Sequence, residues 1–95
     1  MRIIGGSLKG RRLSAINTKS NTTNLRPTTD RIKESLFNIL FGGKFDVKIE
    51  EARILDIFAG SGALGLEAIS RGAKSCTFIE KNKACISLLD KNLKI

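Results

Sequence analysis

The 95-residue sequence contains no histidine, tyrosine or tryptophan, and these absences exclude several kinds of site. Without histidine the chain lacks the commonest general base and a common zinc ligand. The two cysteines, Cys76 and Cys85, do not have metal-ligand spacing, so no metal site is predicted. We interpret them as buried free thiols in a reducing compartment rather than as a disulfide. Any chemistry must therefore depend on carboxylates, amides or a cofactor.

Long apolar runs are also absent, because no stretch approaches the roughly 18 residues of a membrane span. Met1 leads into an alternating, charged segment rather than a secretory signal. With 41% apolar and 27% charged residues, the composition is that of a globular protein. The sequence therefore predicts one small cytoplasmic domain with no membrane partner.

Acidic residues are absent from positions 1 to 26, which hold six basic residues and so carry +6 of the formal net charge of +8. A basic segment of this kind suits a polyanion such as nucleic acid. A solvated arm that only aids solubility is the alternative. The residues predicted to contact RNA are Lys9, Arg11, Arg12 and Arg26.

Residues 2–16, RIIGGSLKGRRLSAI, read as two short strands around a Gly-Ser-Leu-Lys-Gly turn, which predicts a hairpin. A polar loop follows, and after Pro27 the pattern becomes helical. Thr28 or Thr29 can cap this helix, and the Gly42–Gly43 pair ends it. Its predicted buried face consists of Ile32, Leu36, Ile39 and Leu40.

The second half of the sequence alternates strand and helix. We predict strands at 53–58 and 75–80, a helix at 63–71 with Gly72 after it, and a last helix capped by Asn82. In the last helix, Ile86, Leu89 and Leu93 form the apolar stripe. Strand, helix, strand and helix in about 40 residues is the βαβ pattern, whose strands pair in parallel.

Between the first strand and its helix, Gly60, Gly62 and Gly65 have the G-x-G-x-x-G spacing of nucleotide-binding turns. Glu80 ends the next strand, twenty residues after Gly60, where an acid accepts hydrogen bonds from ribose hydroxyls. Together these features predict an adenosine-type cofactor. The alternative is that the glycines only form a tight turn and that Glu80 is a solvated charge.

Asp56 indicates which cofactor binds, because it lies just before the glycine turn. A carboxylate there would repel a pyrophosphate, whereas the sulfonium and amino groups of S-adenosylmethionine are cationic. Asp56 therefore favours the methyl donor over a dinucleotide. Three readings stay open: a methyltransferase, a non-catalytic RNA-binding remnant, and an NAD-dependent oxidoreductase fragment. Asp56 could also simply cap the amides of the turn.

Four segments together resemble a known family. The segments ILDIFAGSGALGLEAISRGA, FIEKN, LRPTTDRIKESLFNIL and MRIIGGSLKGRRL are similar to the bacterial 16S rRNA guanine-N2 methyltransferases of the RsmD type. The resemblance implies a Rossmann-like class I methyltransferase fold of the α/β class with an N-terminal hairpin. It also implies S-adenosylmethionine as cofactor and a guanine N2 amine in 16S rRNA, within the small ribosomal subunit, as acceptor.

The resemblance further implies which residues hold the cofactor. The methionine end would lie on Asp56 and the turn, Glu80 would hold the ribose, and two residues after Glu80 would lie beside the adenine. An upstream motif, which includes Arg26, would pack over the site and engage the methionine carboxylate. The predicted cofactor-binding residues are Thr28, Thr29, Arg31, Asp56, Phe58, Ala59, Gly60, Ser61, Gly62, Glu80, Lys81 and Asn82.

The sequence departs from this family in one respect. The family's catalytic Asn/Asp-Pro-Pro-aromatic motif is missing, because the only proline is Pro27. No catalytic residue is therefore assigned. We expect an N-terminal fragment with three parts: a basic hairpin and loop (1–26), a helix and linker over the cofactor site (27–52), and the first two βα units (53–95). An exposed sheet edge would then favour self-association.

Overall fold

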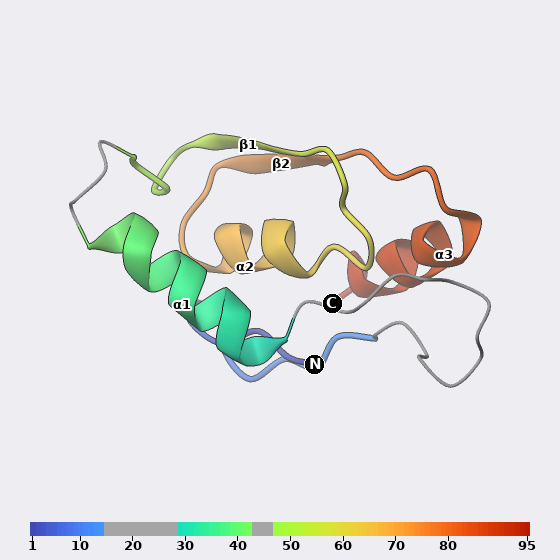
Figure 1. Cartoon of the computed structure of the whole chain (residues 1–95), viewed down its shortest axis with the longest axis horizontal. Helices are drawn as coiled ribbons and strands as arrows, with labels where there is room; N and C mark the ends of the chain where they lie inside the picture. The colour runs from blue at the N-terminus through green and yellow to red at the C-terminus, as the bar shows by residue number, and fades with distance from the viewer. Residues whose placement is uncertain (15–28, 43–46) are drawn as a thin grey trace.

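The computed structural model describes residues 1–14, 29–42 and 47–95. Three helices, α1 (Asp30–Phe41), α2 (Ala63–Ser70) and α3 (Lys83–Asn92), accompany two strands, β1 (Arg53–Asp56) and β2 (Ser75–Phe78). The strands form a two-stranded parallel sheet in which Arg53 pairs with Ser75 and Asp56 with Phe78. The predicted βαβ unit is confirmed, and the fold is a small α/β arrangement (Figure 1).

Both strands are shorter than predicted, but pairing continues beyond them. The N–H of Ile79 donates to the Asp56 carbonyl at 2.9 Å, and the N–H of Ala59 donates to the Ile79 carbonyl at 3.0 Å. The chain after β1 therefore stays attached to the chain after β2 as it enters the glycine turn. The helix that follows ends as predicted, since Gly72 has a left-handed φ of 109°.

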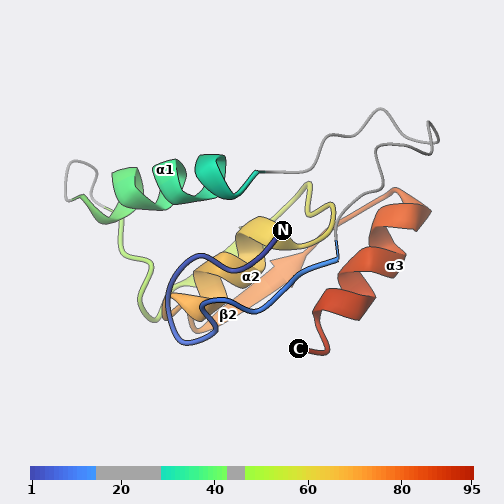
Figure 2. The same cartoon turned by 90° about the horizontal axis from the view of Figure 1, so that it is seen from below.

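The predicted N-terminal reversal of the chain is confirmed, but the two predicted strands are not, because only an isolated bridge forms there. Arg2 and Arg12 form an isolated antiparallel bridge, and the N–H of Leu13 donates to the Met1 carbonyl at 2.9 Å. Ile3 and Leu13 are buried in one cluster with Ala63 and Leu66 of α2. The layers therefore run from the sheet through α2 to the hairpin, as Figure 2 shows from below.

The predicted helix at α1 is confirmed, and Thr29 is its cap, accepting from the Ile32 N–H at 3.2 Å. The predicted buried face is wrong, because Ile32 and Ile39 are 58% and 53% exposed and Leu36 is also exposed. The buried residues are Lys33 and Phe37, with Leu40 partly buried, a face rotated around the helix. A search for apolar periodicity counts lysine as a polar residue, so it could not assign Lys33 to the buried face.

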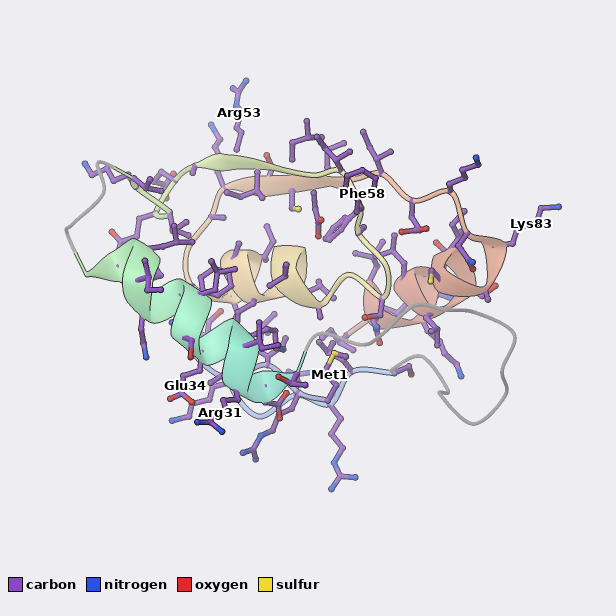
Figure 3. The ribbon with its side chains drawn as sticks, viewed as in Figure 1. Met1, Arg31, Glu34, Arg53, Phe58 and Lys83 are labelled. Atoms are coloured by element: carbon purple, nitrogen blue, oxygen red, sulfur yellow. The ribbon has the colours of Figure 1, made fainter. Side chains whose placement is uncertain are left out.

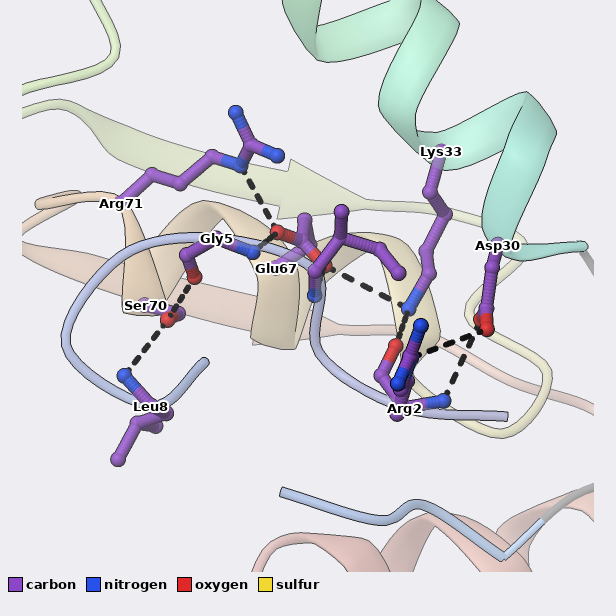
Figure 4. A network of polar contacts seen from close by, with 9 residues as sticks. Arg2, Gly5, Leu8, Asp30, Lys33, Glu67, Ser70 and Arg71 are labelled. Atoms are coloured by element: carbon purple, nitrogen blue, oxygen red, sulfur yellow. Dashed lines mark hydrogen bonds and ion pairs between the residues drawn. The ribbon is translucent and has the colours of Figure 1, made fainter. Parts of the chain in front are cut away.

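A cluster of buried charges explains that rotation. Lys33 and Glu67 have no exposed side-chain surface, and the Lys33 Nζ lies 3.5 Å from Glu67 Oε1. The other carboxylate oxygen accepts from Arg71 Nε at 2.8 Å. The carboxylate also accepts from the N–H groups of Ile4 and Gly5, at 2.9 and 3.0 Å. This Glu67 cluster joins the hairpin, α1 and α2 (Figure 4).

The last helix also shows a partial mismatch with the sequence pattern. Its cap is confirmed, because the Asn82 side chain accepts from the Cys85 N–H at 3.1 Å. Leu89 is buried as predicted, but Ile86 and Leu93 are exposed. The other buried positions of α3 are Cys85 and Asn92. An asparagine therefore completes the buried stripe.

The sheet is covered on one face only within the described residues. Ile54, Asp56, Cys76 and Phe78 alternate with the exposed positions of β1 and β2 and are partly buried. The opposite face has no described helix over it (Figure 1). Leu55, Ile57 and Ile79 are each at least half exposed. In the described parts, no helix has the length and apolar character that a membrane span requires.

Candidate functional site

The glycine turn joins β1 to α2 and depends on two left-handed residues. Gly60 has φ +57° and Gly62 has φ +86°, a region that residues with a Cβ rarely adopt. The Gly62 N–H donates to the Ala59 carbonyl at 2.8 Å, and Gly62 occupies the N-cap of α2. The turn therefore folds back on itself immediately before the helix begins.

The two glycines have different surroundings. A Cβ built on Gly60 would have no neighbouring atom within 4 Å, whereas one on Gly62 would lie 2.5 Å from Leu89 Cδ1 of α3. The turn is thus open at Gly60 and packed against α3 at Gly62. A ligand can approach the backbone on the open side.

Gly65 permits close packing of α2 on β2. A Cβ there would overlap the ring of Phe78 and would lie 2.7 Å from Cys76 Sγ. The helix axis can approach the strand because this residue has no side chain. This glycine therefore serves packing, as its place one turn into the helix suggests.

Glu80, which follows β2, accepts a hydrogen bond from the open side of the turn and so links the two segments. Its carboxylate accepts from the N–H groups of Asn82 at 2.7 Å, Gly60 at 2.8 Å and Lys81 at 3.0 Å. The bonds from Asn82 and Gly60, followed by that from Lys81, lower the pKa of the Glu80 carboxyl despite some desolvation. Glu80 is therefore ionised at neutral pH and has a fixed orientation beside Gly60.

Asp56 presents a buried carboxylate oxygen that lacks a partner. Its Oδ2 has no hydrogen-bond donor among the described residues. Burial raises the pKa of the Asp56 carboxyl, the Gly65 N–H opposes this, and the nearby Glu80 charge raises it further. Burial, with a smaller contribution from the Asp56 charge, also raises the pKa of Cys76 to about 11, so this thiol is not a nucleophile at neutral pH.

An unpaired buried oxygen of this kind is costly, because burying a carboxylate without a donor carries a desolvation penalty. Because this oxygen has almost no accessible surface, a bound positive charge would stabilise it through the electric field in the low-dielectric interior rather than by direct contact. The residues at this turn therefore fit a cationic ligand better than an anionic one.

The other predicted cofactor residues lie in several environments. Ala59 and Ser61 are buried within the turn, whereas the Phe58 side chain is 90% exposed and Lys81 is exposed. Asn82 uses its side-chain oxygen to cap α3. Arg31 is exposed on α1, far from Phe58 in the view of Figure 3. Thr29 caps α1.

The predicted RNA-contacting residues of the hairpin, Lys9, Arg11 and Arg12, are all exposed. Arg26 and Thr28 lie outside the described residues.

Sequence reasoning missed Asn92, whose buried amide contacts the glycine turn. Its Nδ2 donates to the Ser61 carbonyl at 2.8 Å. The signal for it was weak: Asn92 follows Cys85 and Leu89 at helical spacing, on what becomes the buried face. Glu67 offered a clearer signal, because it is the only charged residue in the apolar helix ALGLEAIS.

Comparison with known proteins gives a consistent result along the whole chain. Residues 1–95 match the family model described as Conserved hypothetical protein 95. The chain is 50% identical over 93 residues to Ribosomal RNA small subunit methyltransferase D of Escherichia coli (strain K12), covering 98% of this chain and 42% of that protein. The protein of the same name from Haemophilus influenzae is 47% identical over 93 residues, covering 98% and 44%.

A solved structure, "Putative methyltransferase yhhF from Escherichia coli", superposes with a TM-score of 0.74 at 46% identity, covering 99% of this chain and 45% of that one. The chain therefore spans less than half the length of the relatives that it matches.

Proposed function

Because the chain belongs to the small-subunit ribosomal RNA methyltransferase D family, matched by the Conserved hypothetical protein 95 model, we propose that it forms the cofactor-binding part of a Rossmann-like methyltransferase. The proposed reaction is S-adenosylmethionine-dependent methylation of the exocyclic N2 amine of a guanine in 16S rRNA. The relatives' shared name supports rRNA as the substrate. The cofactor and the guanine position are our proposals.

The observations that carry the cofactor proposal are the buried, unpaired Oδ2 of Asp56 and the open turn at Gly60, four residues later in the chain. An ionised carboxylate attracts a cationic ligand most strongly where water is excluded. S-adenosylmethionine has an amino group and a sulfonium and no phosphate, so its charge matches this oxygen. A dinucleotide would bring its pyrophosphate close to the same carboxylate.

The chain's other residues would hold the remaining parts of the cofactor. Three of the roughly four acceptor positions of the Glu80 carboxylate are occupied by backbone N–H groups, which leaves room for one ribose hydroxyl. Lys81 and Asn82 would flank the adenine, and the segment of Thr28, Thr29 and Arg31 would contact the methionine carboxylate. When bound, S-adenosylmethionine supplies an electrophilic methyl group.

The hairpin would contribute to RNA binding through charge. Lys9, Arg11 and Arg12 are exposed, and no acidic residue accompanies them in the hairpin. Contacts of this kind attract phosphates without reading sequence, so the affinity should fall steeply as salt is added. Choice of the target nucleotide would need groups outside these residues.

Calorimetry with S-adenosylhomocysteine and with NAD tests the proposal. We expect the chain to bind S-adenosylhomocysteine but not NAD, and Asp56→Asn to weaken that binding about tenfold, the loss of one favourable charge interaction. The same change should not lower the free energy of unfolding, because the Asp56 carboxylate is desolvated without a full set of partners. Asp90→Asn, at an exposed position of α3, is the matched control.

Preference for NAD would contradict the methyl-donor proposal. Binding of RNA without binding of S-adenosylhomocysteine would instead favour a non-catalytic RNA-binding role for the hairpin. Unchanged S-adenosylhomocysteine affinity in Asp56→Asn would remove the electrostatic argument.

A further inference from the structure

One buried amide connects three parts of the chain that are distant in sequence. Asn92, near the end of α3, is 2% exposed. Its Nδ2 donates to the Ser61 carbonyl in the glycine turn at 2.8 Å and to the Ser14 carbonyl at the end of the hairpin at 3.0 Å. Its Oδ1 accepts from the Ser14 N–H at 2.7 Å. Both amide hydrogens and the oxygen are therefore used.

The contact with Ser61 fixes the orientation of one peptide group of the turn. The peptide between Ser61 and Gly62 has its carbonyl held by Asn92 and its N–H held by the Ala59 carbonyl at 2.8 Å. Leu89, one helical turn before Asn92, packs against Gly62. Thus α3 supports the packed side of the turn, and the open side at Gly60 is left for a ligand.

The contact with Ser14 ties the same amide to the basic hairpin. Ser14 exchanges two hydrogen bonds with Asn92, as a neighbouring strand would. The amide cannot be inverted without placing its oxygen against two carbonyl oxygens. The position of the hairpin end and the position of the turn are therefore set by one rigid side chain.

We propose that Asn92 is a positioning residue that holds the Ser61 peptide for cofactor binding and couples cofactor binding to the seating of the hairpin. The coupling rests on the proposed function, whereas the positioning of the turn does not. If the cofactor stabilises the turn, it should also stabilise the Ser14 contact, and a seated hairpin should increase cofactor affinity by the same factor.

Amide hydrogen exchange followed by NMR tests the positioning in the ligand-free chain. In Asn92→Ala, the Ser14 and Gly62 N–H groups should exchange at least about tenfold faster, because the buried partners of the amide are left unsatisfied. The Leu13 N–H, which donates to the Met1 carbonyl, should change less. Asn38→Ala, which removes an exposed amide from α1, should leave all three unchanged.

A second variant separates the two contacts and keeps the test informative if Asn92→Ala does not fold. Asn92→Asp retains an acceptor for the Ser14 N–H but has no donor for the Ser61 carbonyl at neutral pH. We expect Ser14 protection to persist while the affinity for S-adenosylhomocysteine falls about tenfold. A general loss of structure would instead speed exchange of the Ser14 N–H as well as weaken binding.

The coupling has its own readout. Saturating S-adenosylhomocysteine should slow exchange of the Ser14 N–H in the wild-type chain but not in Asn92→Ala.

Equal exchange at Ser14 and Gly62 in wild type and Asn92→Ala would overturn the positioning role. Wild-type affinity in Asn92→Asp would overturn the link to cofactor binding. If the wild-type chain does not bind S-adenosylhomocysteine, the proposed function and the coupling both fail, and the exchange rates alone decide the positioning.

Discussion

At the scale of single residues, Gly65 shows how packing can reverse an intrinsic preference. Alanine normally stabilises a helix interior relative to glycine by about 0.5–1 kcal/mol. At position 65, however, a methyl group would occupy the space of the Phe78 ring and approach Cys76 Sγ. Neither neighbour is the free end of a long flexible side chain, so β2 and α2 would have to separate.

We therefore expect Gly65→Ala to lower the free energy of unfolding by about 1–3 kcal/mol, the usual cost of overpacking. Urea unfolding followed by circular dichroism measures it. Gly42→Ala is the matched control, because Gly42 is exposed, has a negative φ, and a Cβ there would come no closer than 3.1 Å to a non-adjacent residue, at the Asn38 carbonyl oxygen. A Gly65→Ala variant as stable as wild type would show that the sheet and helix accommodate the methyl group without cost.

The residues of the turn were predictable because their signals are local. Gly60, Gly62 and Glu80 follow from spacing within one βαβ unit, and the structure places Glu80 on the Gly60 N–H. Asn92 was not predictable in the same way. Its partners Ser14 and Ser61 are 78 and 31 residues away, and no periodic pattern encodes which buried position carries an amide.

At the scale of elements, α1 shows where periodicity fails. The bounds of α1 follow from its cap and its terminal glycine, but the buried face includes Lys33 and Phe37 instead of Ile32 and Ile39. The ion pair with Glu67 and the packing of Phe37 with Ile49 and Ala68 determine the rotation. Both depend on partners elsewhere in the chain.

The Glu67 cluster predicts an order of effects. Glu67→Gln leaves the buried Lys33 ammonium without its anion, so we expect a loss of about 3–5 kcal/mol, enough to unfold a small domain. Lys33→Met should cost less, because Glu67 would still accept from Arg71 and from two backbone N–H groups. Thermal unfolding of both variants, with the exposed Glu34→Gln as control, measures this order. A larger loss in Lys33→Met would contradict it.

At the scale of the whole molecule, the sheet is incomplete. Leu55, Ile57 and Ile79 lie on a face that no described helix covers, and both strands have an outer edge that no described strand pairs. The matched relatives have more than half of their length outside the matched region, which is chain of sufficient length to cover this face. Unpaired edges and contiguous apolar surface both favour association between chains.

We therefore expect the chain to self-associate, with a mean mass in sedimentation experiments that rises with concentration. Leu55→Lys should reduce this association without lowering stability, because the side chain is 56% exposed and its loss leaves no cavity. Ile39→Lys, at a similarly exposed position on α1, is the control. A monomer at all concentrations would contradict the expectation.

The contacts of the hairpin have a consequence for the order of events during synthesis. Residues 2–14 are translated before Glu67, Ser70 and Asn92, three of the residues that hold them, which follow 62 to 78 positions later. Contacts so far apart in sequence form slowly, because a long loop must close before they stabilise anything. The hairpin is therefore among the last parts of this region to reach its native position, and the Ser14 backbone has no partner amide until α3 has emerged from the ribosome.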